Sequence, residues 1–173
     1  LLLANQKLSQ NAPLQKKLND HYAYLDSTKR LILVTVHRRE NQGPILNGIL
    51  SAISTLSEKH PECEFLFPVH PNPAIKIASQ KFLSGHQNVH LVDPLDYLAF
   101  IYILRRCYFV LTDSGGVQEE APSLQKPVLI LRSETERNEG IEANVAKLIG
   151  TDSANIINEC SRLLSDDDLY KQM

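Results

Sequence analysis

Short apolar runs alternate with segments of helical periodicity along most of this chain. The run Leu31–Val36 is almost continuously aliphatic or β-branched, as in a strand buried on both faces of a parallel sheet. From Pro44 the apolar residues recur at helical spacing, with Pro44 suited to a first turn and Pro61 beyond the end. The pattern predicts one strand followed by one helix.

The same alternation continues to residue 164. Further strands are predicted at Glu64–Val69, Val89–Val92, Tyr108–Thr112, Pro127–Leu131 and Val145–Ile149. Further helices are predicted at Pro73–Leu83, Pro94–Arg106, Val117–Leu124 and Ser153–Leu164. Short right-handed crossovers between such elements give an α/β fold with a Rossmann-like, doubly wound parallel sheet. We expect residues 1–29 to form a helical lead-in and residues 30–173 to form the domain.

Composition excludes several classes of function. The 18 Lys and Arg residues against 20 Asp and Glu give a net charge of −2, which argues against binding to nucleic acid or an anionic membrane. Three widely spaced cysteines provide neither a disulfide framework nor a metal motif, and fit a reducing cytoplasm. The longest uncharged apolar stretch, Leu98–Leu104, is too short to span a bilayer. Since Leu1 is not an initiator Met, we expect the chain to begin inside a longer protein.

Polar residues follow the predicted strands, where ligands bind in sheets of this kind. His37 and Arg38 open a charged segment after the first strand, and guanidinium and imidazole groups suit a phosphate. A solvated loop with Glu40 paired to an Arg is the alternative. His70 follows the second strand in a stiff His-Pro-Asn-Pro turn, where a structural role is the simpler interpretation.

The segment after the strand Tyr108–Thr112 has the sharpest pattern. Gly115 and Gly116 allow a ligand to approach the backbone closely, and Ser114 adds a hydroxyl, so the segment predicts a phosphate site. A plain turn with Ser114 as helix N-cap is the alternative. Neither a P-loop nor a GxGxxG fingerprint is present.

Two residues elsewhere are further candidates. Arg137 lies in a charged segment beyond the strand Pro127–Leu131, where it suits an anionic ligand. Phe100 lies on a predicted helix, where it either packs in the core or stacks on a base.

Four motifs in this order carry a family resemblance. Over about residues 31–150 the chain resembles the non-hydrolysing UDP-N-acetylglucosamine 2-epimerases. The motifs that carry the resemblance are, in chain order, HRREN, HPNP, DSGGVQEEAPSLQKPVLILR and TERNEG. The resemblance implies a two-domain architecture similar to the GT-B glycosyltransferases, with the active site between two Rossmann-like domains and no cofactor. It implies that this chain is the C-terminal, nucleotide-binding domain, without the N-terminal one.

The resemblance assigns roles by position. His37 matches a catalytic residue close to the reacting diphosphate. The matched UDP-binding residues are Phe100 beside uracil, Glu120 at the ribose hydroxyls, Arg137 on the UDP-sugar, and Ser114, Gly115 and Gly116 at the diphosphate. Arg38 and His70 match positions of a second, regulatory UDP-GlcNAc site in bacterial members.

The implied reaction interconverts UDP-GlcNAc and UDP-ManNAc by elimination of UDP and its re-addition. The proton-transferring carboxylates belong to the absent domain, so we expect this chain alone to be inactive, and monomeric where the full-length protein is a homodimer. A hydrolysing epimerase, a GT-B glycosyltransferase and a non-enzymatic nucleotide-binding module are the alternatives.

This sequence departs from the family pattern at three positions. Gln125 and Asn144 stand where glycine is usual, and Asn138 stands where proline is usual. Asn tolerates a left-handed backbone better than Gln does, so a positive φ would be harder to accommodate at Gln125.

Overall fold

A single six-stranded parallel sheet forms the centre of the computed structural model, which describes residues 1–173. The strand order is β3-β2-β1-β4-β5-β6, and every neighbouring pair is parallel. The strands are β1 (Arg30–Thr35), β2 (Cys63–Pro68), β3 (Val89–Val92), β4 (Phe109–Thr112), β5 (Val128–Ile130) and β6 (Ala146–Leu148). The doubly wound α/β prediction is therefore confirmed.

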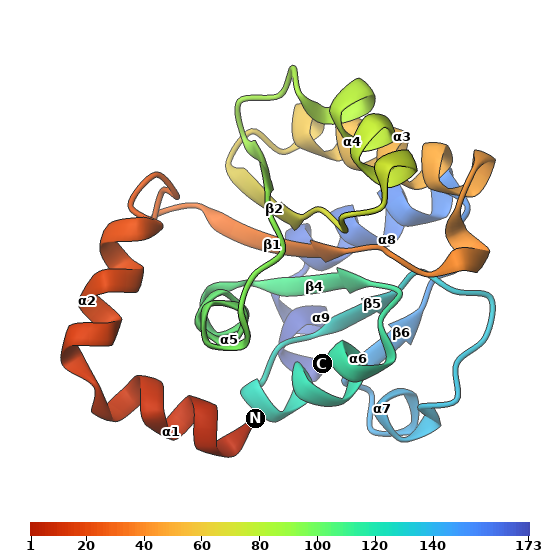
Figure 1. The fold of residues 1–173 in the computed structure, drawn as a ribbon. Helices are drawn as coiled ribbons and strands as arrows, with labels where there is room; N and C mark the ends of the chain where they lie inside the picture. Colours follow the sequence, from red (N-terminus) through yellow and green to blue (C-terminus); the bar gives the residue numbers. More distant parts are fainter.

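Helices cover both faces of this sheet (Figure 1). On one face lie α3 (Pro44–Lys59), α4 (Pro73–Leu83), α8 (Ser153–Ser165) and α9 (Asp167–Gln172). The other face carries α1 (Leu2–Gln10), α2 (Ala12–His21), α5 (Tyr97–Arg106), α6 (Gly115–Glu120) and α7 (Asn138–Glu142). No helix is both long enough and apolar enough to cross a bilayer.

The sheet separates two hydrophobic clusters of 25 and 19 buried residues. Strand β1 contributes to both, because successive side chains point to opposite faces. Ile32 and Val34 belong to the larger cluster, and Leu31 and Leu33 to the smaller. A strand buried on both faces explains the unbroken apolar run in the sequence.

The strand order reverses at β1, which has β2 on one side and β4 on the other. The chain runs outward from β1 to β3 and then returns to β4 beside β1. The loops after β1 and β4 therefore leave the sheet in different directions and open a crevice between them, where ligands bind in folds of this type.

Two predicted helices have different bounds in the structure. The helix predicted to start at Pro94 starts at Tyr97, because the Asp96 carboxylate accepts a hydrogen bond from Ala99 N at 2.8 Å and caps it. The helix predicted over Val117–Leu124 is α6 followed by a separate 3-10 turn at Pro122–Leu124, since a proline nitrogen has no hydrogen to donate to a helix. Helix α7 was not predicted.

The segment of residues 1–29 folds as two helices against α5. Asn11 separates them, and its side chain caps α2 by accepting from Leu14 N at 2.9 Å. Tyr22 is buried, and its ring stacks on Tyr102 of α5 with centroids 5.7 Å apart. This contact joins the segment to α5, and α2 lies at the end of the sheet opposite the crevice (Figure 1).

Two of the three departures from the family pattern lie at turns, and the third lies at the start of a helix. Gln125 and Asn144 have φ of 57° and 56°, and they are the two non-glycine residues with positive φ. Glycine adopts a positive φ without steric cost, whereas Gln125 has a Cβ atom that makes this conformation unfavourable. Asn138 is the first residue of α7, a position that suits proline.

Candidate functional site

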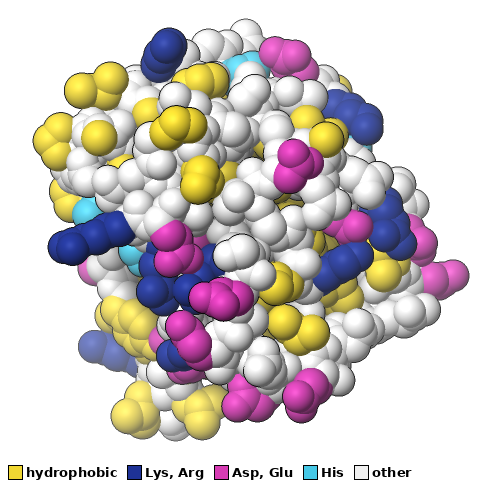
Figure 2. Space-filling model, turned by 90° about the vertical axis from the view of Figure 1, so that its right-hand side faces the viewer, with side chains coloured by type: hydrophobic (Ala, Val, Ile, Leu, Met, Phe, Trp, Pro, Cys, Tyr) yellow, Lys and Arg dark blue, Asp and Glu magenta, His cyan; other side chains and the backbone are white.

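Four loops meet at the edge of the sheet where the strands end. They follow β1, β2, β4 and β5 and carry most of the residues predicted to bind a ligand. Basic and acidic side chains lie next to each other on this face, with histidine beside them (Figure 2). We refer to residues 37–43 as the β1 loop and to residues 132–137 as the β5 loop.

A pocket of about 230 Å³ at this edge brings together four of the predicted site residues. His37, His70, Phe100 and Ser114 all line it, although they come from four different segments of the chain. The imidazole rings of His37 and His70 are nearly parallel, with an interplanar angle of 13° and centroids 6.0 Å apart. Two larger cavities flank α2 and contain none of these residues.

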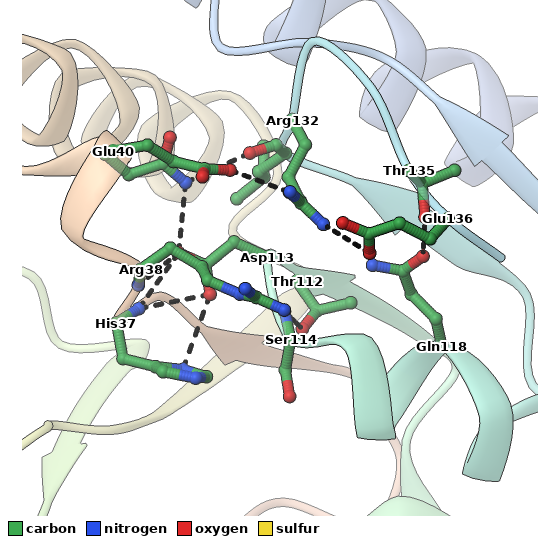
Figure 3. Close-up of polar contacts among 12 residues, drawn as sticks. His37, Arg38, Glu40, Thr112, Asp113, Ser114, Gln118, Arg132, Thr135 and Glu136 are labelled. Carbon is green, nitrogen blue, oxygen red and sulfur yellow. Dashed lines mark hydrogen bonds and ion pairs between the residues drawn. The ribbon is translucent and has the colours of Figure 1, made fainter.

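The carboxylate of Asp113 holds the β1 loop in place (Figure 3). Asp113 is fully buried at the end of β4. Its oxygens accept from the backbone N–H groups of His37 and Arg38, at 3.0 and 2.8 Å, and from the Asn41 amide at 3.0 Å. Asn41 is buried as well and also donates to Leu131 O. The β1 loop is therefore fixed to β4 and to the end of β5.

Two guanidinium groups converge on Gly115, at the start of α6. A Cβ at this position would lie 3.4 Å from Nη2 of Arg38 and 3.5 Å from Cζ of Arg137. Nothing lies within 4 Å of the corresponding position at Gly116, which is exposed. Gly115 thus lets two cations approach the backbone closely, and Gly116 beside it leaves room for a ligand. This arrangement suits an anion with several oxygens, such as a diphosphate.

The Ser114 hydroxyl is available to a ligand. Ser114 occupies the N-cap position of α6, but its side chain makes no capping hydrogen bond. Its backbone N–H donates to Oγ1 of Thr112 at 2.9 Å, which fixes the turn. Ser114 is therefore the N-cap of α6 in position, as in the alternative interpretation of this segment, but without a capping hydrogen bond from its side chain.

Glu120 lies at the other end of α6 and does not line the pocket. Its carboxylate accepts a hydrogen bond from the hydroxyl of Tyr97 at 2.7 Å, and this bond raises the pKa of Tyr97. Phe100 is half-buried one turn further along the same helix as Tyr97. Helix α5 therefore positions both an aromatic ring of the pocket and the partner of Glu120.

A buried arginine links the β1 loop to the β5 loop. Nε of Arg132 donates to Glu40 at 2.7 Å, and its Nη1 lies 3.5 Å from the Glu136 carboxylate. The hydrogen bond with Glu40 raises the pKa of Arg132, and the nearby Arg132 charge lowers that of Glu136. The Arg partner considered for Glu40 in the sequence therefore exists and comes from the β5 loop.

Arg137 is held by exposed carboxylates. Its Nε donates to Glu119 at 2.8 Å and its Nη1 to Glu136 at 3.2 Å. The side chains of Arg137 and Glu119 are 38% and 58% exposed, so solvent screens this ion pair. An anionic ligand can therefore compete with Glu119 for the guanidinium.

The three cysteines take no part in this edge. All are buried and unpaired. Burial raises the pKa of Cys63 and of Cys107 to about 12, which keeps both thiols protonated at neutral pH and removes them as nucleophiles. No group of three or more His, Cys, Asp or Glu side chains is arranged to hold a metal ion.

The sequence interpretation missed Asp113 and Arg132 as organising residues. Asp113 directly follows β4 and Arg132 lies two residues after β5, and buried charged residues need partners. The position of Asp113 before Ser-Gly-Gly was visible in the sequence, but its partners lie more than 70 residues away along the chain.

Comparison with known proteins identifies the family of this chain. A family model described as UDP-N-acetylglucosamine 2-epimerase matches residues 2–173. The chain belongs to the UDP-N-acetylglucosamine 2-epimerase family. The resemblance that the four motifs predict is thereby confirmed at the level of the family.

Individual relatives agree with this assignment. A UDP-N-acetylglucosamine 2-epimerase of Yersinia pestis is 46% identical over 164 residues, which are 94% of this chain and 44% of the relative. The crystal structure of the Neisseria meningitidis UDP-GlcNAc 2-epimerase bound to UDP-GlcNAc is 38% identical, with a TM-score of 0.96 over 99% of this chain and 46% of that one. The chain spans less than half the length of these relatives.

The fold also resembles part of a glycosyltransferase. The C-terminal domain of a group 1 glycosyltransferase from Francisella tularensis matches with a TM-score of 0.68, covering 91% of this chain and 85% of that one, at 12% identity. At this identity the match shows a shared fold alone. It agrees with the expected similarity to one half of a GT-B enzyme.

Proposed function

We propose that this chain is the UDP-binding, C-terminal domain of a non-hydrolysing UDP-GlcNAc 2-epimerase. The observation that carries the proposal is the pair of guanidinium groups of Arg38 and Arg137 beside Gly115, next to the uncapped hydroxyl of Ser114. Helix α6 has only six residues, so the two side-chain charges are the main attraction for the diphosphate. The Neisseria meningitidis relative, whose structure contains UDP-GlcNAc, supports the same ligand.

Each part of UDP has a matching part of the site. Ser114 and the backbone of Gly115 and Gly116 receive the diphosphate, with Arg137 as the adjustable counter-charge. Phe100, half-buried in the pocket wall, packs beside the uracil. Glu120 accepts from the ribose hydroxyls once the ligand displaces the Tyr97 hydroxyl from its carboxylate.

The reaction needs both domains. In the proposed mechanism the C2 proton and UDP are eliminated from UDP-GlcNAc to leave 2-acetamidoglucal. A proton then adds to C2 on the other face and UDP adds back to C1, which gives UDP-ManNAc. Positive charge beside the diphosphate stabilises the departing UDP. His37 is the catalytic residue contributed by this chain, and the carboxylates that move the C2 proton come from the other domain. This chain alone therefore binds UDP without turnover.

The oligomeric state follows from the same assignment. We propose that the full-length protein is a homodimer joined through the domain outside this chain. Sedimentation velocity then gives a monomer for this chain and a dimer for the full-length protein. A stable dimer of this chain would contradict the proposed arrangement.

Calorimetric titration with UDP tests the site, with UMP and ADP as controls for the diphosphate and the base. We expect UDP to bind more tightly than either control. Ser114→Ala removes one hydrogen bond to the phosphate and should weaken binding by about 1–2 kcal/mol. Glu120→Ala should weaken the binding of UDP more than the binding of inorganic diphosphate, because Glu120 contacts only the ribose.

Two matched variants separate these effects from general damage. Ser123→Ala removes an exposed serine hydroxyl and Glu142→Ala an exposed glutamate, both outside the pocket. UDP affinity should be unchanged in both. If a folded wild-type chain shows no preference for UDP over ADP, the assignment of Phe100 and Glu120 is wrong. If Ser114→Ala binds like the wild type, the diphosphate assignment is wrong.

A further inference from the structure

The buried carboxylate of Asp113 does more than hold a loop. Its two oxygens have different surroundings. Oδ2 accepts from the Arg38 N–H, the Asn41 amide and the His37 N–H, at 2.8, 3.0 and 3.0 Å. Oδ1 shares the His37 N–H at 3.1 Å and also faces Nδ1 of the His37 ring at 3.4 Å. The second oxygen is thus directed at the imidazole.

This contact bears on which ring nitrogen of His37 carries the proton. A carboxylate surrounded by N–H donors acts only as an acceptor and would repel a lone pair on Nδ1, so the 3.4 Å contact favours a hydrogen on Nδ1. In the neutral ring Nε2 then has a free lone pair. A carboxylate that orients a histidine in this way selects its tautomer.

His70, on the opposite side of the pocket, has the other tautomer. Its Nδ1 accepts a hydrogen bond from the backbone N–H of Asn72 at 3.2 Å. The proton of the neutral ring therefore lies on Nε2. The two stacked imidazoles, 6.0 Å apart, thus present different groups, a proton acceptor on His37 and a donor on His70.

We propose that Asp113 is a positioning residue that keeps a proton on Nδ1 of His37. Nε2 of His37 can then take up a second proton and donate a hydrogen bond from this N–H to a phosphate of bound UDP. The role toward UDP rests on the proposed function, whereas the tautomer does not. The Asp113 carboxylate and, across the pocket, the His70 ring face His37, and the guanidinium of the neighbouring Arg38 lies beside Gly115. The buried negative charge of Asp113 offsets the positive charge that forms on the ring.

The near-isosteric variant Asp113→Asn separates this role from loop anchoring. Its amide oxygen can replace Oδ2 and keep the bonds from Arg38, Asn41 and the His37 N–H. Its NH₂ group then points at Nδ1 of His37 and donates to it. The proton of the neutral ring must move to Nε2, which reverses the tautomer while the loop stays in place.

Long-range ¹H–¹⁵N NMR of the imidazole rings reads this directly in the ¹⁵N-labelled chain without ligand. At a pH where the rings are neutral, we expect His37 as the Nδ1–H form in the wild type and as the Nε2–H form in Asp113→Asn. His70 should remain the Nε2–H form in both and serves as an internal reference. The spectrum of His37→Gln identifies the His37 signals, and Asp20→Asn, an exposed carboxylate on α2, is the matched control.

The wild-type spectrum alone can overturn the proposal, even if Asp113→Asn fails to fold. A wild-type His37 in the Nε2–H form would be incompatible with it, as would an unchanged tautomer in a folded Asp113→Asn. Titration with UDP then tests the consequence, and we expect at least tenfold weaker binding in Asp113→Asn and no change in Asp20→Asn. If the tautomers are as expected but the wild type binds no UDP, the proposed function fails and the positioning of His37 by Asp113 stands.

Discussion

The β1 loop and the β5 loop both bring a guanidinium group to Gly115, but different forces hold them in place. The β1 loop is tied by short hydrogen bonds to Asp113, which is fully buried. Arg137 of the β5 loop is held by Glu119 and Glu136, whose side chains are 58% and 67% exposed. The β1 loop is therefore fixed before a ligand arrives, whereas Arg137 can exchange its exposed carboxylate partners for a ligand.

The difference has an energetic basis. A buried N–H group that loses its acceptor costs about 1–3 kcal/mol, whereas an exposed ion pair contributes about 0–1 kcal/mol. The fixed β1 loop gives a ligand a defined position, and the exposed Arg137 of the β5 loop can move onto the ligand at little cost in free energy. Substitutions that affect the two loops should therefore differ in the size and in the kind of their effects.

The largest effect is expected for Asp113→Ala. The substitution leaves the N–H groups of His37 and Arg38 and the amide of Asn41 without their acceptor, so the free energy of unfolding should fall by about 3 kcal/mol or more. Urea denaturation followed by circular dichroism measures this loss.

Glu119→Ala is the matched substitution for the β5 loop. It removes an exposed carboxylate and should change the free energy of unfolding by less than about 0.5 kcal/mol. Equal losses of unfolding free energy in Asp113→Ala and Glu119→Ala would show that the β1 loop is held no more firmly than Arg137 of the β5 loop.

Arg137→Ala should reduce ligand binding rather than stability. Loss of a charge-assisted hydrogen bond to the diphosphate weakens UDP binding by about 1.5–2 kcal/mol, or roughly tenfold to thirtyfold. The salt dependence of UDP binding should decrease in the same variant, because one cation has been removed. Titration calorimetry at two salt concentrations measures both.

The control for Arg137→Ala is Arg105→Ala. Arg105 lies on α5, where its guanidinium contacts Ser9 of α1, away from the pocket. UDP affinity and its salt dependence should be unchanged there. An Arg137→Ala variant that binds UDP as tightly as the wild type would show that Arg137 stays with Glu119 in the complex.

The sequence predicted the fold from apolar runs, because burial on both faces leaves a direct record in strands such as β1 and β4. It also indicated the loops that form the candidate site. His37, His70, Phe100 and Ser114 are far apart in the chain, yet parallel strands bring the segments that carry them to one edge. Their roles in UDP binding stay predictions.

Other features could not be predicted from local sequence. The partners of Asp113 depend on which strands become neighbours, and that is decided by the whole sheet. The bond between Tyr97 and Glu120 joins two helices in the same way. Helix α7 has only five residues, too few for a helical period to appear in the sequence.

Gln125→Gly should stabilise the chain moderately. Gln125 has a φ of 57°, a conformation that costs a residue with a side chain about 1 kcal/mol relative to glycine. We expect the free energy of unfolding to rise by a similar amount, offset in part by the greater freedom of glycine in the unfolded chain. This turn precedes β5, so the test also shows whether strain there affects the β5 loop. UDP affinity should not change.

Asn144→Gly is the comparison for Gln125→Gly. Asn144 has nearly the same φ, 56°, but Asn tolerates it better, and its side chain also donates to Gln172 O. Its gain in stability should therefore be smaller than that of Gln125→Gly. If Gln125→Gly destabilises the chain, the side chain of Gln125 contributes more than its backbone strain costs.

The smallest effect is expected for Glu136→Gln, and it depends on pH. The charge of Arg132 holds the pKa of Glu136 below its usual range in the folded protein. Glu136 therefore stabilises the fold at neutral pH, where it is ionised in both states, and this stabilisation is lost as the pH falls below about 4 and through the folded pKa. Urea unfolding at pH 7 and pH 3 should show a slight destabilisation in the variant at pH 7 that is smaller at pH 3.

Glu134→Gln is the control for Glu136→Gln, because Glu134 is exposed in the same loop and its carboxylate forms none of the ion pairs there. Its stability should equal that of the wild type at both pH values. Added salt should reduce the effect of Glu136→Gln at pH 7, since water and ions reach this pair, but should leave the loss in Asp113→Ala nearly unchanged. If salt reduced both losses to the same extent, burial would not be what separates the two loops.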